Sequence, residues 1–99
     1  MVDLIWTEPA LADLQDIAAW IALDKPIAAK RFVRKVFEEV ELLRKHPHLG
    51  SMPKELRGTR YRHLIISPVR IFYRQEGSKI YLVHVMRGER RFRVEDFEE

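Results

Sequence analysis

Two apolar stripes at helical spacing dominate the first half of the chain. After the start signal Thr7-Glu8-Pro9, apolar side chains recur every three or four residues and predict a helix from about Glu8 to Leu23. A second stripe predicts a helix from about Pro26 to Lys45, which Pro47 ends. Because only a short break separates these amphipathic helices, we expect them to form an antiparallel hairpin.

The second half of the chain reads as short β-strands. They are expected at about Thr59–Ile66, Val69–Gln75 and Lys79–Met86, after an earlier β-prone run at Val2–Trp6. Gly77-Ser78 suits a two-residue hairpin turn. A tight turn there would place Phe72 opposite Val83 and Arg74 opposite Tyr81, with Arg70, Phe72 and Arg74 on one face.

The order β-αα-βββ predicts an α+β fold. We expect one domain over residues 1–99, with a helix hairpin packed on a small antiparallel sheet and a charged C-terminal tail over about 87–99. The hairpin covers one face of the sheet, so the other face is expected to be open. The arginines of the strands are the side chains that would decorate this open face.

Charge is distributed unevenly along the chain. Residues 50–93 carry 11 Lys/Arg and 3 Asp/Glu, a net of about +8, whereas residues 1–49 carry a net of about −1. A basic sheet suits a polyanion or an acidic partner. The sequence has no cysteine, no apolar run long enough to cross a membrane and no signal-like start, so we expect a cytoplasmic protein.

Several short motifs, in order along nearly the whole chain, resemble the RelE/ParE superfamily of bacterial type II toxins, and its ParE branch in particular. These motifs are Ile5-Trp6-Thr7, Asp24-Lys25-Pro26 with Ala28-Ala29, Pro47-His48-Leu49-Gly50, Arg57-Gly58-Thr59-Arg60, Val69-Arg70-Ile71-Phe72-Tyr73 and His84-Val85-Met86-Arg87-Gly88-Glu89-Arg90. The resemblance implies a growth-inhibiting toxin of a plasmid-stabilisation system, encoded with a cognate antitoxin. ParE-like members poison DNA gyrase without hydrolysis. RelE-like members cut messenger RNA on the ribosome.

The nuclease alternative has partial support in the residues. Its branch implies that Arg70 binds phosphate through its planar guanidinium, with Arg87 or Arg90 as the arginine at the end of the last strand. The lysines of the preceding strand are missing and no tyrosine follows Arg90, so acid–base work would fall to His63 or Tyr61. These departures favour the gyrase branch, and whether the chain is an enzyme stays open.

Partner binding is expected to use the basic sheet and the helix hairpin. An acidic antitoxin segment would wrap both, through charge-assisted pairs and apolar anchors. The candidate partner-binding residues are Arg60, Arg62, Arg70, Arg74, Arg87 and Arg90. The resemblance implies that operator DNA is bound only through the antitoxin. A plain nucleic-acid-binding module is a third possibility, although the chain lacks an RRM-type signature.

The remaining polar residues suggest no cofactor and no metal site. His46 and His48 flank a proline in a loop, and two residues without a third ligand are weak evidence for a metal. His84 lies among apolar residues and is expected to be packed and hydrogen-bonded. The acidic end, namely Glu95, Asp96, Glu98 and Glu99, is expected to be disordered.

Overall fold

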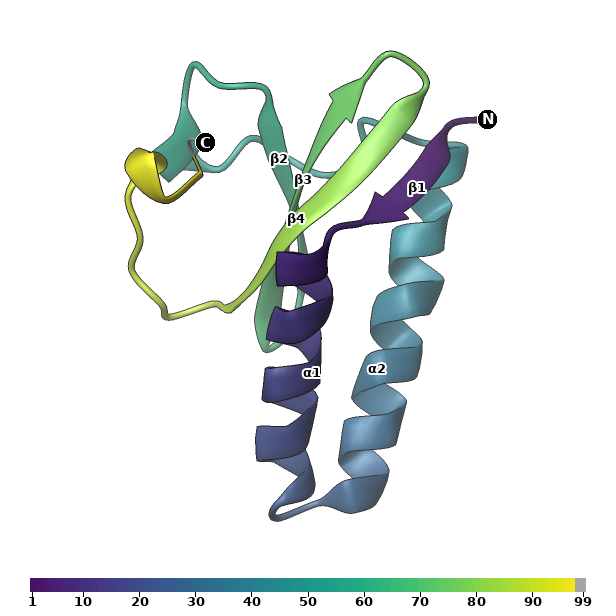
Figure 1. The fold of residues 1–99 in the computed structure, drawn as a ribbon, viewed down its shortest axis with the longest axis vertical. Helices are drawn as coiled ribbons and strands as arrows, with labels where there is room; N and C mark the ends of the chain where they lie inside the picture. The colour runs from purple at the N-terminus through teal and green to yellow at the C-terminus, as the bar shows by residue number, and fades with distance from the viewer. Residues whose placement is uncertain (98–99) are drawn as a thin grey trace.

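Two antiparallel helices cover one face of a four-stranded sheet and extend beyond it (Figure 1). The structure, a computed structural model, describes residues 1–97 of the 99. Its elements are β1 (Asp3–Trp6), α1 (Glu8–Ala22), α2 (Pro26–Glu41), η1 (Leu42–Arg44), η2 (Lys54–Leu56), β2 (Tyr61–Ile66), β3 (Val69–Glu76), β4 (Lys79–Arg87) and η3 (Val94–Phe97), where η marks a 3₁₀ turn. The predicted β-αα-βββ order and the α+β class are confirmed.

The helix ends follow their capping residues. Thr7 accepts a hydrogen bond from Ala10 N at 3.3 Å and donates its hydroxyl to Leu82 O at 2.8 Å, so the start of α1 is fixed to β4. The second helix was expected to reach Lys45, but its α-helical part ends at Glu41. The next turn tightens into η1, a common way for a helix to satisfy its last carbonyls.

The sheet has the order β1-β4-β3-β2. β1 runs parallel to β4, so the sheet is mixed where an antiparallel one was expected. The parallel pairing of β1 with β4 needs a long connection between the two strands, and the helix hairpin lies in that connection. Within residues 1–97, β1 pairs only with Lys79–Leu82 of β4, and the second half of β4 has no strand neighbour on that side.

A β-bulge shifts the register between β3 and β4. Arg74 lies opposite Tyr81 as predicted, but Phe72 lies opposite His84 and not Val83. The tight turn fixes the pairing near Gly77, and one extra β4 residue then enters the ladder. Tyr61 begins β2, two residues later than expected, because Thr59 closes a turn through its hydroxyl onto Leu56 O at 2.6 Å.

The main core lies between the helices and the sheet. Apolar residues of both helices meet alternate residues of β2, β3 and β4 there, which matches the predicted stripes. Its fully buried members are Ala10, Val36, Leu43, Ile71, Ile80 and Leu82.

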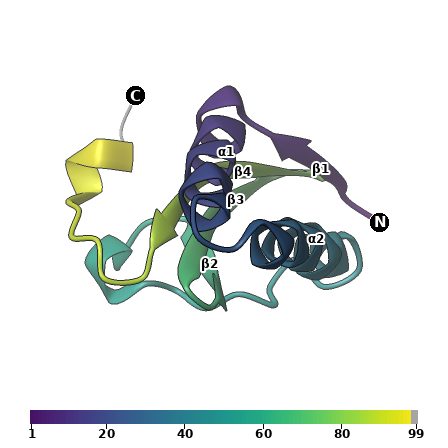
Figure 2. The same ribbon diagram turned by 90° about the horizontal axis from the view of Figure 1, so that it is seen from below.

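The opposite face of the sheet is covered, contrary to expectation. Residues 88–97 turn back from the end of β4 towards η2, and Figures 1 and 2 show this C-terminal strap beside the sheet, away from α2. Phe97 is buried against Phe72, with ring centroids 5.0 Å apart, in a second core that includes Leu56, Val83 and Met86. The charges of the tail masked this apolar role of its two phenylalanines in the sequence.

The strap also corrects the expectation of a disordered acidic end. Glu95 and Asp96 lie in η3, where the Asp96 carboxylate accepts a hydrogen bond from Arg93 N at 2.9 Å. The burial of Phe97 supplies the apolar contact that orders this turn. Glu98 and Glu99 lie outside the described residues.

The Pro47–Gly50 loop is held by one buried tyrosine. The Tyr73 hydroxyl donates to Pro47 O at 3.0 Å and accepts from Gly50 N at 2.9 Å. Burial raises the pKa of Tyr73, so the phenol stays neutral and keeps its donor. A Cβ at Gly50 would lie 2.6 Å from His63 O, which explains why the loop ends in glycine.

We expect Gly50→Ala to lower the free energy of unfolding by about 1–3 kcal/mol, because the added methyl group overpacks a rigid site. Gly88→Ala is the matched control, since its Cβ would meet nothing nearer than Pro68 O at 3.7 Å. Urea denaturation of both variants measures the difference. Equal stabilities for the two variants would contradict this account of Gly50.

Candidate partner-binding groove and the arginine sites

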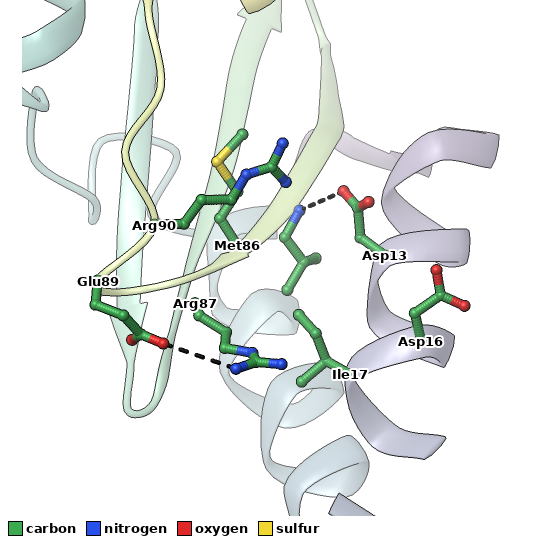
Figure 3. A pocket seen from close by; sticks show the side chains of 8 residues that line it. Asp13, Asp16, Ile17, Met86, Arg87, Glu89 and Arg90 are labelled. Carbon is green, nitrogen blue, oxygen red and sulfur yellow. Dashed lines mark hydrogen bonds and ion pairs between the residues drawn. The ribbon is translucent and has the colours of Figure 1, made fainter. Parts of the chain in front are cut away.

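A groove of about 390 Å³ lies between α1 and the end of β4 (Figure 3). Its lining residues are Asp13, Asp16 and Ile17 from α1, Val85, Met86 and Arg87 from β4, and Glu89 and Arg90 from the following turn. The groove exists because β1 stops short and leaves this half of β4 without a strand.

A side chain protects the uncovered edge of β4. The Asp13 carboxylate accepts a hydrogen bond from Val85 N at 3.0 Å and lies 3.4 Å from His84 Nδ1. His84 also packs edge-on against Phe97, with centroids 5.0 Å apart, so the expectation of a packed, hydrogen-bonded histidine is confirmed. An acidic residue at a free edge prevents indiscriminate strand pairing and keeps the groove accessible.

Arg87 and Trp20 form an exposed stacked pair beside the groove. The Arg87 guanidinium carbon lies 3.9 Å from the centroid of the Trp20 ring. The Arg87 side chain is 42% exposed, and Trp20 as a whole residue is 53% exposed. Leu23 and Ile27 continue the apolar surface at the tip of the helix hairpin. Tryptophan and arginine are enriched in the residues that contribute most to protein–protein affinity.

The two walls of the groove carry opposite charges. Asp13 and Asp16 project from α1, and Arg87 and Arg90 lie on the β4 side, where Glu89 is 3.9 Å from Arg87 (Figure 3). Such a surface fits a protein segment that presents both acidic and basic side chains. It fits a uniform polyanion poorly, because the α1 wall would repel one.

Arg70 is the most connected charged group on the other face of the sheet. Its two terminal nitrogens donate to the two Glu55 oxygens at 2.9 Å each, and its Nε donates to His63 Nδ1 at 3.2 Å. The guanidinium carbon also lies 4.9 Å from the Phe72 centroid and 5.1 Å from the Phe92 centroid. Only 12% of the Arg70 side chain is exposed, so it serves as an internal link.

This network shifts two pKa values. The hydrogen bonds from Arg70 lower the pKa of Glu55 to about 2. Burial, with the nearby Arg70 charge, lowers the pKa of His63 below its usual 6.5. His63 is therefore neutral at pH 7, with its Nδ1 lone pair taken by Arg70.

The four residues of the nuclease alternative do not form one site. Arg70 and His63 lie together, but the Tyr61 hydroxyl donates to Phe97 O at 3.0 Å in the strap. Arg87 is stacked on Trp20 at the groove. Glu55, which the sequence analysis did not single out, occupies the bidentate position where Arg70 would bind a phosphate.

The other candidate arginines serve different contacts. Arg62 donates to Gly50 O at 2.8 Å and supports the Pro47–Gly50 loop. Arg74 lies 4.7 Å from the Tyr81 ring centroid, while the exposed Arg60 pairs with Glu76 at 2.9 Å. Only Arg87 and Arg90 of the six predicted partner-binding arginines line the groove. Partner binding by any of the six remains a prediction.

Sequence reasoning missed three features of these sites. It did not single out Trp20, overlooked Glu55, and did not predict that the charged tail packs against the sheet. The only available signal for the strap was the pair of aromatic residues in a charged segment, Phe92 and Phe97. Within residues 1–97 there is no cluster of potential metal ligands, and no helix there is long and apolar enough to span a bilayer.

Comparisons with known proteins agree with this fold. The family model for the ParE toxin of the type II toxin–antitoxin system parDE matches residues 4–92. A solved structure of the chromosomal ParDE toxin–antitoxin system from P. aeruginosa is 26% identical, with a TM-score of 0.77 over 90% of this chain and 98% of that chain. No curated protein matches the sequence. The chain belongs to the ParE toxin family, which confirms the resemblance seen in the sequence.

Glu55 should stabilise the fold in a pH-dependent way. Its pKa falls from 4.5 to about 2 on folding, so the contribution is complete above pH 4.5 and is lost as the pH falls towards 2. Because a third of the Glu55 side chain is exposed, solvent screening reduces this contribution to about 1–2 kcal/mol. Denaturation of the wild type and Glu55→Gln should therefore differ at pH 7, and the difference should disappear as the pH falls through about 2. A difference independent of pH would contradict the ion pair as its source.

Proposed function

We propose that this ParE-family toxin stops growth by inhibiting DNA gyrase through a protein–protein contact, and that a cognate antitoxin neutralises it. The observation that carries this proposal is that Arg70 is already paired with a carboxylate of the same chain. Glu55 occupies both ends of its guanidinium, and the side chain is nearly buried. A gyrase inhibitor needs no free phosphate-binding arginine on the sheet, whereas an RNA-cutting toxin does.

The state of His63 supports the same conclusion. A general base for the 2′-hydroxyl of RNA needs a free lone pair near its substrate. The His63 Nδ1 lone pair accepts from Arg70, and a lowered pKa makes the ring a weaker base. Messenger RNA cleavage would therefore require this network to open first, and we keep it as the alternative.

The groove beside α1 is the proposed antitoxin site. It combines an exposed stacked pair, Trp20 with Arg87, and walls of opposite charge. The solved relative is described as a ParDE toxin–antitoxin system, which supports a partner of this kind. We propose that an antitoxin segment places an apolar side chain on Trp20 and a carboxylate against Arg87 and Arg90.

The target can be tested in purified systems. The wild-type protein should inhibit DNA supercoiling by gyrase and leave translation in vitro unchanged. Addition of the antitoxin encoded beside it should restore supercoiling. Cleaved messenger RNA on ribosomes, with supercoiling intact, would replace gyrase with the nuclease alternative.

The antitoxin site predicts a specific loss of affinity. Trp20→Ala and Arg87→Gln should each weaken antitoxin binding by about 10- to 100-fold, the range expected for central interface residues. Lys79→Gln is the matched control, because Lys79 is exposed at the start of β4 and does not line the groove. Isothermal titration calorimetry measures the three affinities, and equal losses in Arg87→Gln and Lys79→Gln would reject the groove.

A further inference from the structure

A second basic surface lies on the strap, in the turn that follows β4. We call Gly88–Arg93 the arginine loop; its three arginines, Arg90, Arg91 and Arg93, are all exposed. Among residues 1–97 none of these three side chains forms an ion pair, whereas Glu89 lies near Arg87. The proposed antitoxin site leaves Arg91 and Arg93 without a role.

The loop is held in place along its length. Gly88 N donates to Pro68 O at 2.9 Å, and Arg90 N donates to Arg87 O at 3.0 Å. Near the other end, Phe92 packs edge-on against Phe72, with centroids 5.1 Å apart, and Arg93 N donates to the Asp96 carboxylate. The backbone is thus ordered before any ligand arrives, which lowers the entropic cost of binding.

The surroundings of the arginines limit the class of ligand. A protein interface usually needs an apolar or aromatic anchor, but the one aromatic residue of the loop, Phe92, is turned onto the second core. Single-stranded nucleic acid is usually held by exposed aromatic side chains that stack on its bases, and the loop lacks these as well. Guanidinium groups without an anchor suit phosphates on a regular backbone, which duplex DNA presents.

We propose that the arginine loop binds the phosphodiester backbone of duplex DNA, without sequence preference. Arg91 and Arg93 supply two phosphate contacts, and Arg90, at the edge of the groove, supplies a third. The carboxylate of Asp96 is directed to the Arg93 backbone, so it shapes the loop without pairing with a guanidinium. This inference concerns a ligand of the chain itself and holds whether or not gyrase is the target.

The test measures binding of the full-length protein to a fluorescent 20-base-pair duplex by anisotropy. Three phosphate contacts predict a slope of about −2.7 for log K against log salt, or about a 40-fold loss of affinity between 50 and 200 mM. The variant R90Q/R91Q/R93Q should bind at least about tenfold more weakly at 50 mM, with a much flatter slope. Circular dichroism verifies that it is folded.

The control variant, R31Q/R34Q/K35Q, removes the same charge from the exposed surface of α2. It should bind the duplex within about threefold of the wild type, because its residues lie on another element. Equal losses in the two variants would reject the loop as the site, and no binding by the wild type at 50 mM would reject DNA binding altogether. Tighter binding of single-stranded RNA, or stronger displacement by polyglutamate than by unlabelled duplex, would also overturn the proposal.

Discussion

The Arg70 guanidinium makes polar or cation–π contacts with four parts of the chain. It bonds to Glu55 in η2 and His63 in β2, and it lies near Phe72 in β3 and Phe92 in the strap. A nearly buried charge is stable only when its donors are satisfied, so each partner constrains the others. Arg70 therefore helps to fix η2 and the strap against the sheet, and with burial it lowers the pKa of His63.

The same network supports the proposal of a gyrase inhibitor over an RNA-cutting toxin. An arginine fork fits a carboxylate as well as it fits a phosphate, and here the protein supplies the carboxylate itself through Glu55. In the proposed reading, the arginine that resembles the catalytic residue of the RelE branch stabilises the fold. Such reuse shows why a residue match within a superfamily does not transfer a function without its surroundings.

The short β1 strand and the strap divide the surface of the molecule. Because β1 covers only half of β4, the other half borders a groove with Trp20 and Arg87 at its side. The strap closes the far face of the sheet, where the second core is buried, and directs its arginines outward. The stacked pair consequently lies near α1, while three exposed arginines lie on the arginine loop.

Local patterns in the sequence predicted the two helices, the four strands, the turn at Gly77-Ser78, the α+β class and the family resemblance, but not the register beyond the bulge. Each of these depends on local periodicity, capping or an ordered set of motifs, and Arg74 opposite Tyr81 follows directly from the turn at Gly77-Ser78. The parallel pairing of β1 with β4, the bulge before His84 and the packing of Phe97 were decided by tertiary structure. These features join residues far apart in the chain, and apolar spacing shows that a side chain is buried without showing against what. The pairs of Arg70 with Glu55 and of Arg87 with Trp20 could not be predicted from the sequence for the same reason. Only the folded chain brings these partners within contact distance.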